Sequence, residues 1–203
     1  MFMGGSLAAD YEIIADRTAK LADILTNAKE AVLINNGSRL SMSLESRRAV
    51  ASTGIYRNKG QGGNLPSGEA FIAPVEGTAE GEIVIDGSFA GIGSLQAPLK
   101  LTFCQGTLVD VIGPDRDRLI TLLGNNLLAR NLAELGIGTN DKARVIGVVL
   151  EDEKVYGTAH IALGSNDTCG GQVAAGIHVD GVIMTPELYL DGQLILRKGQ
   201  LVL

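Results

Sequence analysis

The chain has 203 residues, of which 45% are hydrophobic, and a net charge of −6 at pH 7. This length and apolar content suffice for one domain with a buried core. The acidic balance, without a basic stripe, argues against a nucleic-acid partner. The two cysteines, Cys104 and Cys169, stand alone, so we expect neither a disulfide framework nor a cysteine-only metal site. The chain shows no signal-peptide pattern and no apolar run of membrane-spanning length, which favours a cytoplasmic protein without a membrane partner.

The beginning of the chain predicts one helix followed by two strands. Asp10 is a typical N-cap residue, and apolar residues spaced by three and four predict a helix over residues 10–28. The segments AVLIN and RLSMSL then have the composition of strands. The Asn-Asn-Gly sequence at 35–37 predicts the turn between them.

The next stretch predicts a loop and further sheet. Residues 54–68 are polar and rich in glycine, so they predict a loop that ends directly before Glu69. EIVIDGSF has strand composition. LKLTFCQGTLVDVIG predicts a hairpin that turns at residues 105–106.

The second half predicts a second helix and more strands. We expect that helix over residues 116–135, with Gly124-Asn125-Asn126 as a candidate interruption and Gly136 as its C-terminal stop. VYGTAHIAL and IHVDGVIM have strand composition. The last segment, ELYLDGQLILRKGQLVL, predicts a hairpin with Asp191-Gly192 at its tip.

These elements add up to an α+β fold made mostly of antiparallel sheet with a few flanking helices. The alternating β-α-β pattern of a nucleotide-binding fold is missing from the predicted elements. Residues 1–9 are interpreted as an N-terminal tail and residues 10–203 as a single domain. The charged run Glu-Asp-Glu-Lys at 151–154 is typical of a solvated turn rather than of a site.

Both histidines of the chain belong to the best candidate site. If IHVDG is a strand, His178 and Asp180 point to the same face, because side chains alternate along a strand. His160 lies 18 residues earlier, in a segment of similar character. Two histidines and one carboxylate are used for iron and, with more carboxylates, for zinc or cobalt. The alternative is a pair of histidines that hydrogen-bond carboxylates on a solvated face.

Three further acids are candidates. Glu69 follows the turn Pro-Ser-Gly, although such a residue is often an exposed loop acid. Glu134 falls near the C-terminal end of the predicted helix, where the helix dipole disfavours a negative charge and a nearby cation would offset that cost. Asp167, within GSNDTCGG, is a turn cap or a further ligand. Phosphate-loop and nucleophile-elbow patterns are missing, so neither a nucleotide site nor a serine triad is expected.

The ordered motifs NLPSGEAFIAPVEGTAEG, NLAELGIGTN, LEDEKVYGTAHIALG and IHVDG resemble the C-terminal catalytic domain of the aminopeptidase T / aminopeptidase S metallopeptidases. The resemblance covers residues 10–203. It implies a dinuclear metal site whose ligands correspond here to Glu69, Glu134, His160, His178 and Asp180. The family's ligating tyrosine falls at Asp167, which can bind a metal but cannot donate a phenolic hydrogen bond. The N-terminal α/β domain of that family has no counterpart in this sequence.

The resemblance therefore implies a metal-dependent, aminopeptidase-like hydrolase. Zinc, cobalt or manganese would activate a water molecule to attack an N-terminal peptide or amide bond of a peptide or small-molecule substrate. Glu69 and Glu134 would be its catalytic carboxylates, and the expected assembly is a homodimer. The same fold family is similar to the 2,5-dihydroxypyridine dioxygenases, in which His160, His178 and Asp180 would hold a single Fe(II). A third hypothesis is a non-catalytic metal-binding subunit.

Overall fold

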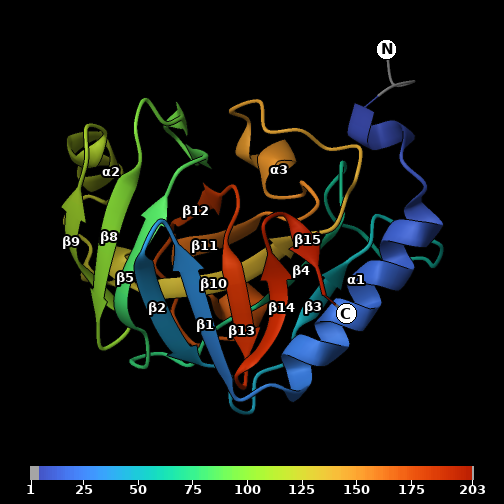
Figure 1. The fold of residues 1–203 in the computed structure, drawn as a ribbon, viewed down its shortest axis with the longest axis horizontal. Helices are drawn as coiled ribbons and strands as arrows, with labels where there is room; N and C mark the ends of the chain where they lie inside the picture. Colours follow the sequence, from blue (N-terminus) through green and yellow to red (C-terminus); the bar gives the residue numbers. More distant parts are fainter. Residues whose placement is uncertain (1–4, 203) are drawn as a thin grey trace.

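The computed structural model describes residues 5–202 and is built mainly of two antiparallel sheets (Figure 1). The first sheet, in spatial order, comprises β15 (Gln200–Leu201), β14 (Gln193–Arg197), β13 (Glu187–Leu190), β1 (Glu30–Asn35), β2 (Ser38–Ser43), β5 (Glu80–Ile85), β8 (Leu99–Cys104) and β9 (Thr107–Ile112). The second comprises β3 (Val50–Ser52), β4 (Glu69–Ile72), β10 (Leu132–Gly138), β11 (Ala159–Gly164), β12 (His178–Ile183), β6 (Ser88–Phe89) and β7 (Gly93–Ser94). The predicted α+β class, rich in antiparallel sheet, is confirmed.

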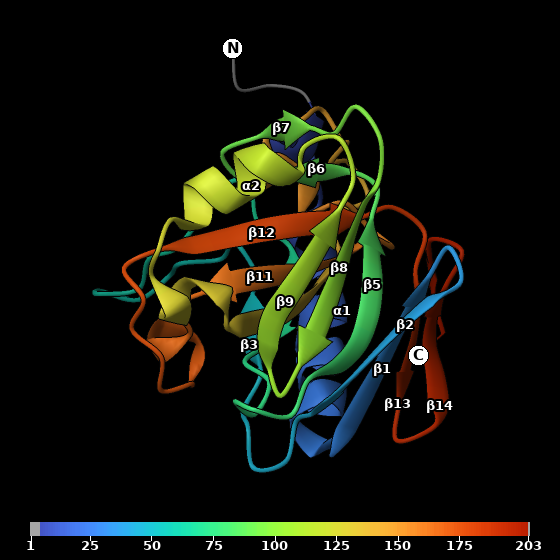
Figure 2. The same ribbon diagram turned by 90° about the vertical axis from the view of Figure 1, so that its left-hand side faces the viewer.

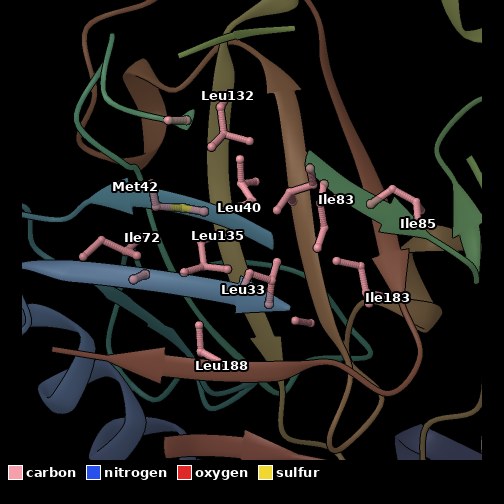
Figure 3. Packing of buried hydrophobic residues seen from close by; sticks show 14 of the residues in the cluster. Leu33, Leu40, Met42, Ile72, Ile83, Ile85, Leu132, Leu135, Ile183 and Leu188 are labelled. Atoms are coloured by element: carbon pink, nitrogen blue, oxygen red, sulfur yellow. The ribbon is translucent and has the colours of Figure 1, made fainter. Parts of the chain in front are cut away.

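The two sheets form separate layers whose strands cross steeply, as the side view shows (Figure 2). Leucine, isoleucine and methionine side chains from both layers fill the space between them (Figure 3). Leu33 and Leu40 come from the first sheet, and Leu135 and Ile183 from the second; all four are fully buried. Because strand side chains alternate, the neighbours of Leu135 and Ile183 point to the opposite face of the second sheet.

Helices lie along the edges of these layers (Figure 1). The longest, α1, packs against β3 and β4 of the second sheet. The helical segments are η1 (Gly5–Ala8), α1 (Tyr11–Asn27), α2 (Arg116–Leu123), η2 (Leu127–Arg130), α3 (Val149–Asp152) and η3 (Asp167–Cys169). Within residues 5–202, none of them has the length and apolar character needed to cross a bilayer.

Most local predictions are confirmed. The Asp10 side chain caps α1 by accepting hydrogen bonds from the backbone N–H groups of Glu12 and Ile13. The three predicted hairpins pair as expected: β1 with β2, β8 with β9, and β13 with β14. The predicted tail begins with residues 1–4, which lie outside the described residues, and continues into η1.

The predicted helix over residues 116–135 is wrong in its second half. Helix α2 ends at Leu123, where Gly124 adopts a positive φ of 60°. Leu132 then starts strand β10, so Gly136 lies inside a strand and is not a helix stop. All seven residues of β10 are buried. A short apolar run that is buried on both faces has no period by which strand and helix can be told apart.

Candidate metal centre

Three neighbouring strands align the central acid and histidine side chains. In the register of the second sheet, Glu134 of β10 pairs with Ala162 of β11, and Ala162 pairs with Asp180 of β12. Two residues further along the same pair of strands, His160 of β11 pairs with Gly136 of β10. The side chains of Glu134, His160 and Asp180 therefore share the face of the sheet that points away from the core. The prediction that His178 and Asp180 lie on one strand is confirmed.

A glycine makes room for the first histidine. A Cβ atom placed on Gly136 would lie 2.0 Å from Nε2 of His160. No other residue type fits beneath this ring without moving it, since real Cβ contacts are never that short. The buried imidazole therefore lies directly against the backbone of β10, with Nε2 close to the carboxylates of Glu69 and Glu134.

The carboxylate of Glu134 lies between the two imidazoles. Its Oε1 is 3.2 Å from Nε2 of His160, and its Oε2 is 3.6 Å from Nε2 of His178. The same His178 nitrogen is 3.4 Å from Oδ1 of Asp180. Oε2 of Glu134 also accepts a hydrogen bond of 3.2 Å from the thiol of Cys169.

The backbone fixes how the second histidine presents its ring. Nδ1 of His178 is 2.7 Å from the carbonyl oxygen of Ser165. A carbonyl oxygen can only accept, so Nδ1 carries the hydrogen and donates it. In the neutral ring Nε2 then has a free lone pair, which is the arrangement found in metal-binding histidines.

The ligand atoms fall into two adjacent groups. Glu134, His178 and Asp180 form the first group, and Glu69, Glu153 and His160 form the second; within each group the atoms lie within 4.8 Å of one another. A buried ammonium holds the two acids together: Nζ of Lys154 donates to Oε1 of Glu69 at 2.6 Å and also to Oε1 of Glu153. Oε2 of Glu69 lies 3.5 Å from Nε2 of His160. The two groups thus meet at His160.

The charged run at 151–154 is consequently not a solvated turn. Asp152 and Lys154 are fully buried, and Glu153 is 8% exposed. The Asp152 carboxylate accepts hydrogen bonds from Ser88 and from the backbone N–H groups of Ile146 and Gly147. These contacts turn Glu153 and Lys154 inward. Sequence alone did not reveal this, because the partners of the run lie on distant segments.

The surroundings shift the protonation of this cluster. Burial raises the pKa of Glu69 to about 7, although the Lys154 ammonium opposes the shift. Burial acts to lower the pKa of His160, but the hydrogen bond to Glu134 and the neighbouring acids raise it to about 9. The pKa of His178 is also raised to about 9, against the effect of burial, by Asp180 and Glu134. Burial raises the pKa of the Cys169 thiol to about 12, so it stays protonated.

A cavity of about 620 Å³ opens onto the cluster. Its lining includes Cys169 and five residues of the cluster: Glu69, Glu134, Glu153, His178 and Asp180. One wall consists of the predicted loop, which carries the aromatic ring of Tyr56 and several glycines, together with β3 and Phe71 of β4. The site is thus both accessible and partly apolar, as small-molecule sites commonly are.

The donor set fits a divalent cation. Four largely buried carboxylates surround the two imidazoles: Glu69 and Glu153 pair with the Lys154 ammonium, and Glu134 and Asp180 face the histidine rings. Among residues 5–202, Oε2 of Glu69 has no hydrogen-bond partner. Buried carboxylate oxygens are rarely left without one, and a bound cation would satisfy both the oxygen and the charge.

Residues 10–203 match the model of the family described as 2,5-dihydroxypyridine 5,6-dioxygenase (NicX). The chain belongs to this family. Among curated protein sequences, none matches the chain significantly. The relation to aminopeptidase T expected from the motifs is thus a relation of fold, and the 2,5-dihydroxypyridine dioxygenases are the direct family.

Two solved structures share the fold. The structure of 2,5-dihydroxypyridine dioxygenase from Pseudomonas putida KT2440 is 21% identical, with a TM-score of 0.87 over 94% of this chain and 60% of that one. AmpT from Thermus thermophilus is 23% identical, with a TM-score of 0.75 over 95% of this chain and 55% of that one. The chain therefore spans somewhat more than half the length of these proteins.

The structure brings five of the six sequence candidates together. Glu69, Glu134, His160, His178 and Asp180 all contribute to the two groups of ligand atoms. Asp167 lies in η3 with an exposed side chain, and neither group of the described residues includes it. Glu134 reaches the site from a strand, so the helix-dipole argument for it does not apply.

Three residues of the site were not singled out by the sequence: Glu153, Lys154 and Cys169. For Glu153 and Lys154 the signal was the motif LEDEKV, which belongs to a stretch that carries the family resemblance; Cys169 lies in a glycine-rich segment between two such stretches. A run of three acids and one lysine resembles a solvated turn unless its burial is known.

Proposed function

We propose that this chain forms the metal-binding domain of a non-haem Fe(II) dioxygenase that opens a dihydroxylated aromatic ring of the 2,5-dihydroxypyridine type. Two histidines and one carboxylate, His160, His178 and Asp180, are the donor set used by mononuclear iron oxygenases. Membership of the 2,5-dihydroxypyridine 5,6-dioxygenase family supports this reading over the hydrolase.

The observation that carries the proposal is the position of Lys154. Its buried ammonium binds both Glu69 and Glu153, the two carboxylates of the second ligand group. A cation already compensates these acids, so a second metal ion would have to displace the ammonium or lie against it. The remaining donors suit one ion, which favours a mononuclear centre over the dinuclear centre of a hydrolase.

The residues of the chain have distinct roles in this proposal. His160, His178 and Asp180 would hold the ion, and bound Fe(II) would supply the activation of dioxygen for ring opening. Glu134 faces the cavity beside both imidazoles, where it can take a proton from a ring hydroxyl. Phe71 and Tyr56 supply apolar surface for a planar ring.

The hydrolase is the second candidate, and one observation favours it. Two adjacent groups of metal-type ligands meet at His160 and Glu134, which is the arrangement needed for two ions that share a water molecule. In this case Glu69 and Glu134 would both be ligands, the ions would be zinc, cobalt or manganese, and the substrate would be a peptide or amide.

Metal content and oxygen uptake decide between these functions. We expect anaerobic reconstitution with Fe(II) to give one iron per chain by plasma mass spectrometry, and oxygen uptake when 2,5-dihydroxypyridine is added. His178→Ala and Asp180→Asn should lose both, whereas Asp110→Asn, on the exposed edge strand β9, should lose neither.

Other outcomes of the same measurements would overturn the proposal. Two zinc, cobalt or manganese ions per chain, together with cleavage of aminoacyl substrates, would establish the hydrolase. A chain that retains no metal after reconstitution would point to a non-catalytic subunit.

A further inference from the structure

The loop over residues 165–177, between β11 and β12, connects the metal centre to a more distant ion pair. The loop carries Cys169, and the carbonyl of Ser165 holds the His178 ring. Only Asn166 and Cys169 of this loop are buried. Few apolar contacts therefore fix its position, which depends on polar contacts to other segments.

Glu76 and Arg47 supply those polar contacts. Oε1 of Glu76 accepts hydrogen bonds from the Asn166 side chain at 2.8 Å and from the backbone N–H of Gln172 at 2.9 Å. Its Oε2 pairs with the Arg47 guanidinium, which donates from NH1 to the carbonyl of Gly170 at 2.5 Å. Neither residue belongs to the loop: Arg47 follows β2, and Glu76 follows β4.

The contacts continue from Asn166 to the histidine. Oδ1 of Asn166 accepts from the backbone N–H of Val173 at 2.8 Å, which closes the loop on itself. Next to it, the hydroxyl of Ser165 accepts from the N–H groups of Ala175 and Gly176. The Ser165 carbonyl then accepts from Nδ1 of His178. Glu76 is thus linked to the ring through its hydrogen bond to Asn166, the peptide bond between Asn166 and Ser165, and the hydrogen bond from His178 to Ser165.

We propose that Glu76 and Arg47 are positioning residues of the metal centre: by fixing this loop they hold the His178 ring with Nε2 free to bind a metal and keep the Cys169 thiol on Glu134. The inference rests on the proposed metal centre but not on the reaction it performs. Burial acts to raise the pKa of Glu76, but the backbone and side-chain donors around it and Arg47 lower it below its usual value, so the carboxylate is charged at neutral pH.

Zn²⁺ affinity, measured by competition with a chelator, tests the first consequence. Glu76→Gln keeps one acceptor oxygen but loses the charge that binds Arg47. We expect its Zn²⁺ dissociation constant to rise by up to about 10-fold, the lower end of the effect of removing a direct partner of a metal ligand, because Glu76 acts on His178 through the loop. Glu187→Gln is a matched control, because Glu187 pairs with Arg197 in the first sheet and its side chain is 26% exposed against 25% for Glu76.

Nitrogen NMR of the metal-free chain provides a readout that a general loss of stability would not change. The sequence has two histidines, so each ring gives its own signals. At a pH above their pKa of about 9, wild type and Glu187→Gln should show His178 with its hydrogen on Nδ1 only. Glu76→Gln should show a mixture of tautomers at His178, while His160 stays unchanged.

Arg47→Met tests the same inference if Glu76→Gln does not fold, since it removes the ion pair and the bond to Gly170 while leaving the Glu76–Asn166 bond. Unchanged Zn²⁺ affinity and an unchanged His178 tautomer in the variant that folds would overturn the inference. If wild type binds no Zn²⁺, the proposed metal centre fails, and the tautomer alone decides whether Glu76 and Arg47 position the ring.

Discussion

Gly136 determines whether the His160 ring can reach its partners. The ring lies so close to the β10 backbone that the methyl group of an alanine would overlap it. We expect Gly136→Ala to displace the imidazole from Glu134 and to lower Zn²⁺ affinity at least about 10-fold, as loss of a well-placed ligand does. Chelator competition measures this. Gly62→Ala is the control, because a Cβ there meets open space; equal affinities in the two variants would contradict the prediction.

Lys154 tests the number of metal ions directly. Lys154→Met removes the ammonium that compensates Glu69 and Glu153 and leaves two buried acids without a partner. We expect the free energy of unfolding to fall by about 3–5 kcal/mol in chemical denaturation without metal. With excess Zn²⁺, the variant should bind two ions per chain where wild type binds one, and should recover stability.

The exposed pair Lys100–Glu82 provides the control for this substitution. Both side chains are well exposed, so Lys100→Met should change stability by less than about 1 kcal/mol and should not change the metal count. If Lys154→Met still bound one ion and kept its stability, the idea that the Lys154 ammonium takes the place of a second metal ion beside Glu69 and Glu153 would be wrong.

At the scale of elements, strand β10 contributes residues both to the hydrophobic core and to the candidate metal centre. Leu135 points into the core between the sheets (Figure 3), whereas Glu134 points to the metal centre. We expect Leu135→Ala to lower the free energy of unfolding by about 2–5 kcal/mol, the usual cost of such a cavity. Glu134→Gln should mainly lower oxygen uptake with 2,5-dihydroxypyridine, because Glu134 is the proposed proton acceptor beside the ion. Denaturant titration and oxygen-uptake assays on both variants check this division, and the reverse pattern would contradict it.

The same strand shows where sequence reasoning stopped. The segment LAELGIG is buried along its whole length, so its apolar residues follow neither a helical nor a strand period. The hairpins were predictable because each has a turn of defined chemistry and a strand on either side. A strand whose partners are 22 or more residues away, as Ala159 is from Ile137, has no such local signal.

At the scale of the whole molecule, the site depends on contacts that bring together five separate segments. The motifs that carry the family resemblance pointed to Glu69, Glu134, His160, His178 and Asp180 as candidates, and the structure brings these five residues together. The motifs did not reveal Lys154, whose role depends on burial against Glu69, 85 positions away. The expected homodimer stays a prediction, which light scattering of the purified chain can test.

The pH dependence of stability also belongs to the whole molecule. His160 and His178 have a pKa of about 9 in the folded chain against an ordinary 6.5, so the folded state binds more protons than the unfolded state between these values. Their contribution to stability is complete below about pH 6.5 and is lost as the pH rises through about 9. Glu69, raised from 4.5 to about 7, acts in the same direction at lower pH. The metal-free chain should therefore become less stable from mildly acidic to alkaline pH.

A bound divalent ion should reverse this trend, because it binds the neutral imidazoles and must compete with protons. We expect the melting temperature of the metal-free chain to fall between about pH 6 and pH 9, and Zn²⁺ to raise it more at about pH 8 than at about pH 6. Thermal melts with and without Zn²⁺ measure both effects. The double variant His160→Gln, His178→Gln removes the two imidazoles whose pKa is raised to about 9, so its metal-free melting temperature should depend less on pH above about 7. A wild-type melting temperature that rises with pH without metal would show that the two imidazoles are not held in their charged form by Glu134 and Asp180.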